Sequence, residues 1–141
     1  MVERDYIMRI LQEFFDAIAK VMRRDSPGQE PDLSQVQERL KNMYKQFFRK
    51  PADFFYESEK EDILANLKQE TRSEDDLFAR AQMLSELLYQ DGLTKKDIPE
   101  KYMLLEKALY LLEYLDRNSR TFSWDRGQKI EDIRKQMTTY E

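Results

Sequence analysis

The sequence predicts an all-α fold of about six helices. Apolar residues recur at steps of three and four along most of the chain, which is the period of an amphipathic helix. Only 3 glycines and 4 prolines occur among the 141 residues, which leaves little material for a sheet built on tight turns. With 40% hydrophobic and 37% charged residues, the composition is typical of a helical bundle.

The length is that of one domain with a self-sufficient core. We therefore expect a single helical domain over residues 1–141. A subdivision into N-terminal helices at 1–56 and a helical core at 57–141 is the alternative. We expect no binding to nucleic acid. Such binding depends on neutralising phosphates with basic side chains, whereas this chain has a net charge of −4.

An amphipathic helix is expected over residues 5–24, ending at Arg23–Arg24. One face carries apolar side chains at steps of four and three, namely Ile7, Leu11, Phe14, Ile18 and Val21. Four more apolar side chains widen this stripe: Tyr6, Ile10, Phe15 and Met22. A seam of this kind can pair with a copy of itself. The candidate interface residues of this helix, for a homodimer or another protein, are Ile7, Leu11, Phe14 and Ile18.

A second helix is expected after a linker at 25–31, where Ser26-Pro27-Gly28 and Pro31 interrupt the pattern. Asp32 or Ser34 can cap this helix, which runs to about Phe48. Basic side chains and aromatic rings alternate over 39–50, as in a surface that binds nucleic acid. However, the helical period places the rings of this segment on the same stripe as Val36 and Leu40. We therefore expect Tyr44 and Phe47 to face the core.

Three consecutive aromatic residues, Phe54, Phe55 and Tyr56, follow the interruption at Lys50-Pro51. Neighbouring side chains on a helix point about 100° apart, so the three rings cannot all face one core. Packing between helices is one reading and a contact surface is the other. Phe54, Phe55 and Tyr56 therefore complete the set of candidate interface residues.

Four further helices are expected in the second half of the chain. Ser58 with Glu61 has the form of a capping box for a helix to about Glu70. Ser73 with Asp76 opens the next helix, over 74–91, which Gly92 is expected to terminate. Asp97 and Pro99 mark the start of a helix over 98–117, whose nearly continuous apolar surface predicts a central position. The last helix is expected over 123–140.

The three C-terminal helices resemble tetratricopeptide-type hairpins, with Ala81 and Ala108 as small residues where two helices can approach closely. The whole chain also resembles a family of small uncharacterised bacterial helical proteins. This resemblance rests on DYIMRILQEFFDAIAK at 5–20, LLYQDG at 87–92 and KALYLLEYLDRNSRTFSWDRGQKIEDIR at 107–134. It implies a tetratricopeptide-like architecture and carries no implication about catalytic residues.

The chain has no cysteine and no histidine, which excludes thiolate nucleophiles, imidazole ligands and disulfides. Two carboxylate clusters remain as candidate metal ligands, Glu57, Glu59, Glu61 and Asp62, and Glu70, Glu74, Asp75 and Asp76. Both lie at expected helix N-termini, where the helix dipole favours anions. Arg117, Arg120, Arg126 and Arg134 surround the final turn as an anion site or as solvated surface. Trp124, with Phe122 nearby, is expected to staple the start of the last helix.

Taken together, the sequence favours a non-enzymatic interaction or scaffold module without a cofactor. Its expected partner is a protein or a second copy of the chain. The alternative is a helical bundle that binds a small ligand or a metal ion through carboxylates. No apolar run is long enough to span a bilayer and the first helix has balanced charge, so we expect no membrane contact and a cytoplasmic location.

Overall fold

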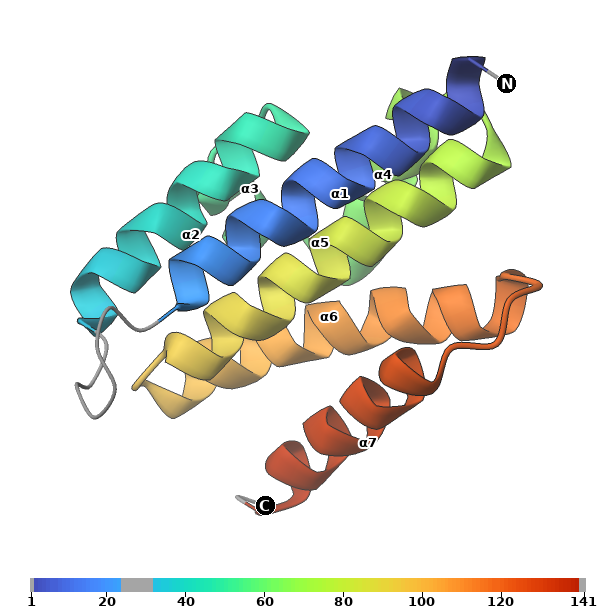
Figure 1. Ribbon diagram of the computed structural model, residues 1–141. Helices are drawn as coiled ribbons and strands as arrows, with labels where there is room; N and C mark the ends of the chain where they lie inside the picture. The colour runs from blue at the N-terminus through green and yellow to red at the C-terminus, as the bar shows by residue number, and fades with distance from the viewer. Residues whose placement is uncertain (1, 24–31, 140–141) are drawn as a thin grey trace. The chain divides into compact units, whose positions relative to one another are not determined.

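The computed structural model describes residues 2–23 and 32–139. Within these residues all regular secondary structure is α-helical, so the all-α prediction is confirmed. The expected linker at 25–31 lies outside the described residues, as does Arg24. The described part contains seven helices, and contacts divide the chain into two compact units, Met1–Ser58 (unit 1) and Glu59–Glu141 (unit 2) (Figure 1).

Unit 1 contains α1 (Val2–Met22), α2 (Leu33–Phe48) and α3 (Ala52–Glu57). Asp32 caps α2 as predicted, because its Oδ1 accepts hydrogen bonds from the N–H groups of Ser34 and Gln35 at 3.1 and 3.5 Å. The helix ends at Arg49, whose φ of 60° is left-handed. The short α3 that follows was not among the six expected helices, and it contains the three consecutive aromatic residues.

The core of unit 1 is aromatic. The Phe14 ring on α1 meets the Phe47 ring on α2 edge to face, with 5.2 Å between centroids. On the same stripe of α2, Tyr44 stacks on Phe55 of α3 at 5.2 Å. Tyr44 and Phe47 are buried, as the helical period predicted. Their rings are therefore not available for stacking on bases.

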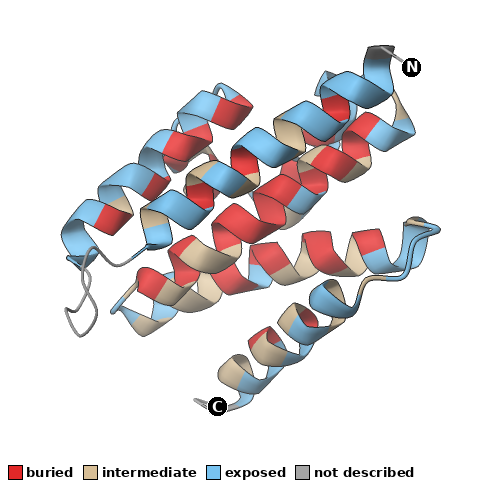
Figure 2. Cartoon of the chain, viewed as in Figure 1, coloured by how far each residue is buried: buried red, intermediate tan, exposed pale blue. Residues whose placement is uncertain are grey.

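Unit 2 contains α4 (Lys60–Glu70), α5 (Glu74–Thr94), α6 (Ile98–Asn118) and α7 (Trp124–Thr139). Helix α6 packs against each of the other three, and its closest contact is the antiparallel pairing with α5 (Figure 1). The predicted central position of α6 is therefore confirmed for this unit. Buried side chains concentrate on α5 and α6 (Figure 2). The core leucines on these two helices are Leu77, Leu84, Leu87, Leu88, Leu104, Leu105, Leu111, Leu112 and Leu115.

Of the caps predicted for the helices of unit 2, those at Ser73 and Asp97 are confirmed and the one at Ser58 is wrong. Ser73 Oγ accepts a hydrogen bond from the Asp76 N–H at 3.1 Å, and Asp97 Oδ2 accepts one from the Glu100 N–H at 3.1 Å. Ser58 does not cap α4. Its N–H donates to the carbonyl of Phe54 at 3.0 Å and closes α3, so α4 begins after Glu59 instead.

The predicted end of α5 at Gly92 is also wrong, because this helix continues to Thr94. Gly92 instead lies close against α6. A Cβ atom at this position would lie 3.1 Å from Leu105 Cδ2 and 3.3 Å from Leu104 Cβ. Close packing of the two helices, and not a left-handed backbone, therefore favours glycine at this position.

Candidate functional site

The candidate interface residues of α1 lie mainly on its buried side. Ile7, Phe14 and Ile18 are buried, and Leu11 is half-buried at the edge of the same stripe. We call Ile7, Phe14 and Ile18 the inner stripe. Since Phe14 also contacts the rings of α2, the inner stripe contributes to folding, and its use as an interface stays a prediction.

The three aromatic residues of α3 divide as the helical geometry requires. Phe55 is buried, whereas Phe54 and Tyr56 are half-buried. Tyr56 meets Tyr44 edge to face at 6.0 Å, and the Lys50 ammonium lies 5.3 Å from the centroid of the Phe54 ring. The segment therefore packs within unit 1 while leaving part of two rings at the surface.

A second apolar stripe runs along α1 beside the inner one. At 100° per residue, Met8, Leu11, Phe15 and Met22 fall within one narrow sector of the helix. Met8 is 62% exposed and Met22 is 36% exposed, while Leu11 and Phe15 are half-buried. We call these four residues the outer stripe. The seven-residue spacing of Met8, Phe15 and Met22 was present in the sequence, but only the structure separates it from the inner stripe.

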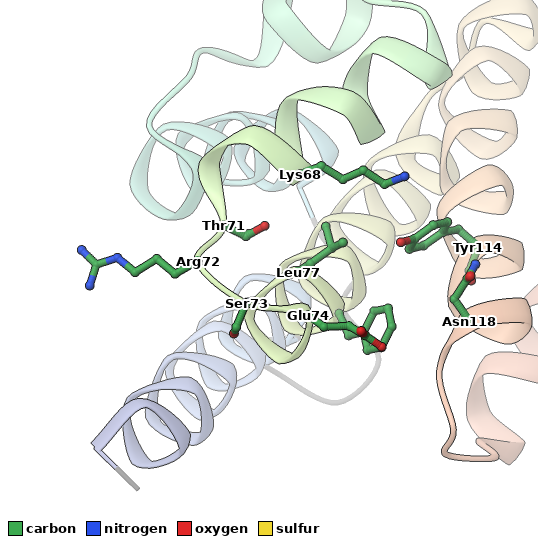
Figure 3. A pocket seen from close by; sticks show the side chains of 9 residues that line it. Lys68, Thr71, Arg72, Ser73, Glu74, Leu77, Tyr114 and Asn118 are labelled. Atoms are coloured by element: carbon green, nitrogen blue, oxygen red, sulfur yellow. The ribbon is translucent and has the colours of Figure 1, made fainter.

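An open pocket of about 390 Å³ lies in unit 2, where the end of α4, the start of α5 and the end of α6 meet. Lys68 extends toward Tyr114, with its ammonium 5.2 Å from the ring centroid, whereas Arg72 points away (Figure 3). The hydroxyl of Thr71 donates to the carbonyl of Leu67 at 2.8 Å. Lys68 and Thr71 are thus engaged with neighbouring protein groups, and the pocket lining carries both signs of charge.

Polar side chains join α5 to α7. Lys129 Nζ lies 2.6 Å from Glu86 Oε2 and 3.0 Å from Asp125 Oδ2. Burial lowers the pKa of Lys129, but the hydrogen bonds and charges of Glu86 and Asp125 outweigh it and leave that pKa above 10.5. The Tyr89 hydroxyl donates to Asp132 at 2.6 Å, and burial together with this bond raises the pKa of Tyr89 well above 10.0. These groups hold the last helix in place.

In the second carboxylate cluster, Asp76 supports the start of α5, whereas Glu59 of the first cluster precedes α4 without a side-chain cap bond. Asp76 Oδ2 accepts a hydrogen bond from the Arg72 N–H at 3.2 Å, which complements the Ser73 cap. Within residues 2–23 and 32–139, no three acidic side chains converge into a group that could hold a metal ion. None of the described helices is long and apolar enough to cross a membrane.

The connection between α6 and α7 displays two aromatic side chains. Phe122 is 83% exposed and Trp124 is 72% exposed, the highest values among the large hydrophobic residues that the structure describes. The expectation that Trp124 staples the start of α7 is therefore wrong. Ser123 provides the start instead, because its Oγ accepts a hydrogen bond from the Arg126 N–H at 3.1 Å.

The four arginines near the final turn are not equivalent. Arg126 pairs with Asp116 at 3.2 Å, and Arg134 pairs with Glu113 at 3.4 Å. Arg117 and Arg120 are exposed and make no ion pair within the described part of the chain. The arginines available to a ligand are therefore these two, next to the exposed aromatic side chains.

The fold and its surfaces define an all-α protein of two helical units, with an amphipathic first helix and an exposed aromatic connection before the last. No protein-family model matches the chain, and no curated protein or solved structure is significantly similar to it.

Proposed function

We propose that the protein is a non-enzymatic interaction module that self-associates through the outer stripe of α1. The observation that carries this proposal is the exposure of apolar side chains along that stripe, from Met8 to Met22. Fourteen residues of helix correspond to about 21 Å, or roughly four turns. A contact of this length suits a second helix with the same heptad-like spacing.

The two stripes of α1 have different expected roles. The inner stripe packs against aromatic side chains of its own unit, as the contact between Phe14 and Phe47 shows. The outer stripe leaves Met8 more than half exposed. Because methionine is flexible and polarisable, it adapts well to a partner surface. A homodimer that uses the outer stripe therefore leaves the core of each copy unchanged.

Light scattering and sedimentation over a range of concentrations would test this proposal. The wild-type chain should form a dimer whose population rises with concentration, and the double variant Met8→Ser/Met22→Ser should remain monomeric. Glu13→Ser is the matched control, since Glu13 is exposed on another side of α1 and its loss should leave the dimer intact.

Two results would contradict the proposal. One is a wild-type chain that stays strictly monomeric at high micromolar concentration. The other is a dimer that the double variant does not weaken. Metal analysis of protein purified without chelator tests the alternative function, because a stoichiometric metal ion would support the carboxylate-based binding bundle instead.

A further inference from the structure

The connection between α6 and α7 combines exposed aromatic rings with unpaired positive charge. We define the aromatic–arginine surface as Arg117, Arg120, Phe122 and Trp124. Its two aromatic side chains are 83% and 72% exposed although they are separated by only one residue. Two large rings exposed this close together in the sequence offer apolar surface to a partner, and exposed apolar surface of this kind marks interaction sites.

The acidic residues beside this surface are outnumbered by basic ones. Asp116 pairs with Arg126 at 3.2 Å, and Asp125 shares Lys129 with Glu86 at 3.0 and 2.6 Å. Arg117 and Arg120 make no such pair among the described residues. The local excess of charge is therefore positive on a chain whose net charge is −4. An anionic partner complements this surface, whereas the rest of the acidic chain repels it.

Hydrogen bonds fix the backbone that carries these side chains. Arg126 donates through Nη2 to the carbonyl of Thr121 at 2.8 Å, and the Thr121 N–H donates to Ser119 Oγ at 3.2 Å. Together with the Ser123 cap of α7, these bonds hold the connection at both ends. A surface that is ordered before binding loses little conformational entropy when a partner docks.

We propose that the aromatic–arginine surface binds a short acidic segment of a partner protein that also carries an apolar side chain. Tryptophan and arginine are the residue types that contribute most to protein interfaces. Two unpaired arginines are enough for the carboxylates of a short peptide, whereas a protein on nucleic acid typically neutralises several phosphates. This inference concerns unit 2 alone and does not rest on self-association through α1.

Selection from a library of short random peptides on the full-length chain would test the proposal. Binders would be counter-selected on the double variant Phe122→Ser/Trp124→Ser, which keeps only peptides that need the surface. Both side chains are largely exposed, so the variant should fold normally, and circular dichroism would verify this. The surviving peptides should be enriched in Asp and Glu together with a large apolar residue.

The same peptides can be measured by the fluorescence of Trp124, which is the single tryptophan of the chain. Binding should shift its emission to shorter wavelength and protect it from acrylamide. Arg120→Glu should weaken binding by about tenfold or more, and added salt should weaken it further. Lys96→Glu is the charge-matched control, because Lys96 is exposed in the same unit but outside the surface, and this variant should bind like the wild type.

Several outcomes would overturn the proposal. They are a selection that yields no peptide dependent on Phe122 and Trp124, enrichment of neutral or basic peptides, and equal losses for Arg120→Glu and Lys96→Glu. Single-stranded oligonucleotides and vesicles containing anionic lipid would be tested in parallel. Binding of either that is tighter than that of every selected peptide, and is lost in the double variant, would assign the surface to that other class of partner.

Discussion

Unit 1 builds its core from aromatic residues, whereas unit 2 exposes two large rings, Phe122 and Trp124. The rings of Phe14, Tyr44 and Phe55 form the core that joins three helices in unit 1. In unit 2 the core is mainly leucine, and Phe122 and Trp124 project from a connection. Since burial of a large ring stabilises the fold, rings left in water contribute little to stability. The comparison therefore separates aromatic residues that build the fold from those available to a partner.

The largest effect should come from removing a buried ring of unit 1. Phe14→Ala should lower the free energy of unfolding by about 3–5 kcal/mol, because it leaves a cavity between α1 and α2. Urea denaturation measures this. Met8→Ala is the matched control on the same helix, and because Met8 is mostly exposed it should change stability by less than about 0.5 kcal/mol. Equal losses in both variants would contradict the distinction between the inner and outer stripes.

The next largest effect should come from the ion pair that holds α7 in unit 2. Lys129→Met should lower the free energy of unfolding by about 1.5–3 kcal/mol, because Glu86 is buried and would lose its charged partner. The control is Arg134→Met, also on α7, which removes an exposed ion pair with Glu113 of α6. This variant should lower the free energy of unfolding by less than about 1 kcal/mol. If thermal denaturation gave the same loss for both, the buried contact would not be what anchors α7.

Disturbing the close packing of α5 on α6 should destabilise the protein about as much as losing Lys129. Gly92→Val should destabilise the protein by about 1–3 kcal/mol, because added carbon atoms would clash with Leu104 and Leu105. Gly127→Val is the control within α7, where a Cβ atom meets nothing within 4 Å, and it should be neutral or slightly stabilising. A harmless Gly92→Val would show that the two helices can separate without loss.

A pH-dependent effect is expected from Tyr89, whose pKa is raised in the folded state. Its stabilising contribution is present below the unfolded value of about 10 and is lost as the pH rises further. The stability difference between wild type and Tyr89→Phe should therefore shrink above pH 10 in denaturation experiments. Tyr110→Phe is the control, because the Tyr110 hydroxyl makes no hydrogen bond within the described residues. A constant difference across this range would contradict the assignment.

The smallest effect should come from the exposed rings of unit 2. Trp124→Ser and Phe122→Ser should each change the free energy of unfolding by less than about 0.5 kcal/mol, since both side chains are mostly in water. Thermal denaturation followed by circular dichroism measures this without using tryptophan fluorescence. A loss comparable to that of Phe14→Ala would mean that these rings are part of a core and would end the contrast between the units.

The sequence by itself determined the helical class and several helix starts. Asp32, Ser73 and Asp97 cap helices as predicted, because a cap and its N–H partner are only a few residues apart. The apolar surface of α6 predicted its central place in unit 2 for a related reason. Its pattern leaves few polar positions, so the helix requires neighbours on more than one side.

Only the tertiary structure decided which apolar side chains are covered. The spacing on α1 merges Phe15 and Met22 with Ile7 in one wide stripe, and the neighbours that bury Ile7 are absent from the local sequence. Gly92 matters because Leu104 and Leu105 of the next helix pack closely against it. Tyr89 donates a hydrogen bond to Asp132, which is 43 residues further along the chain. Caps and periodicity depend on local geometry, whereas burial depends on distant segments. For that reason the sequence predicted the helices, and the structure separated the surfaces available to a partner from the core.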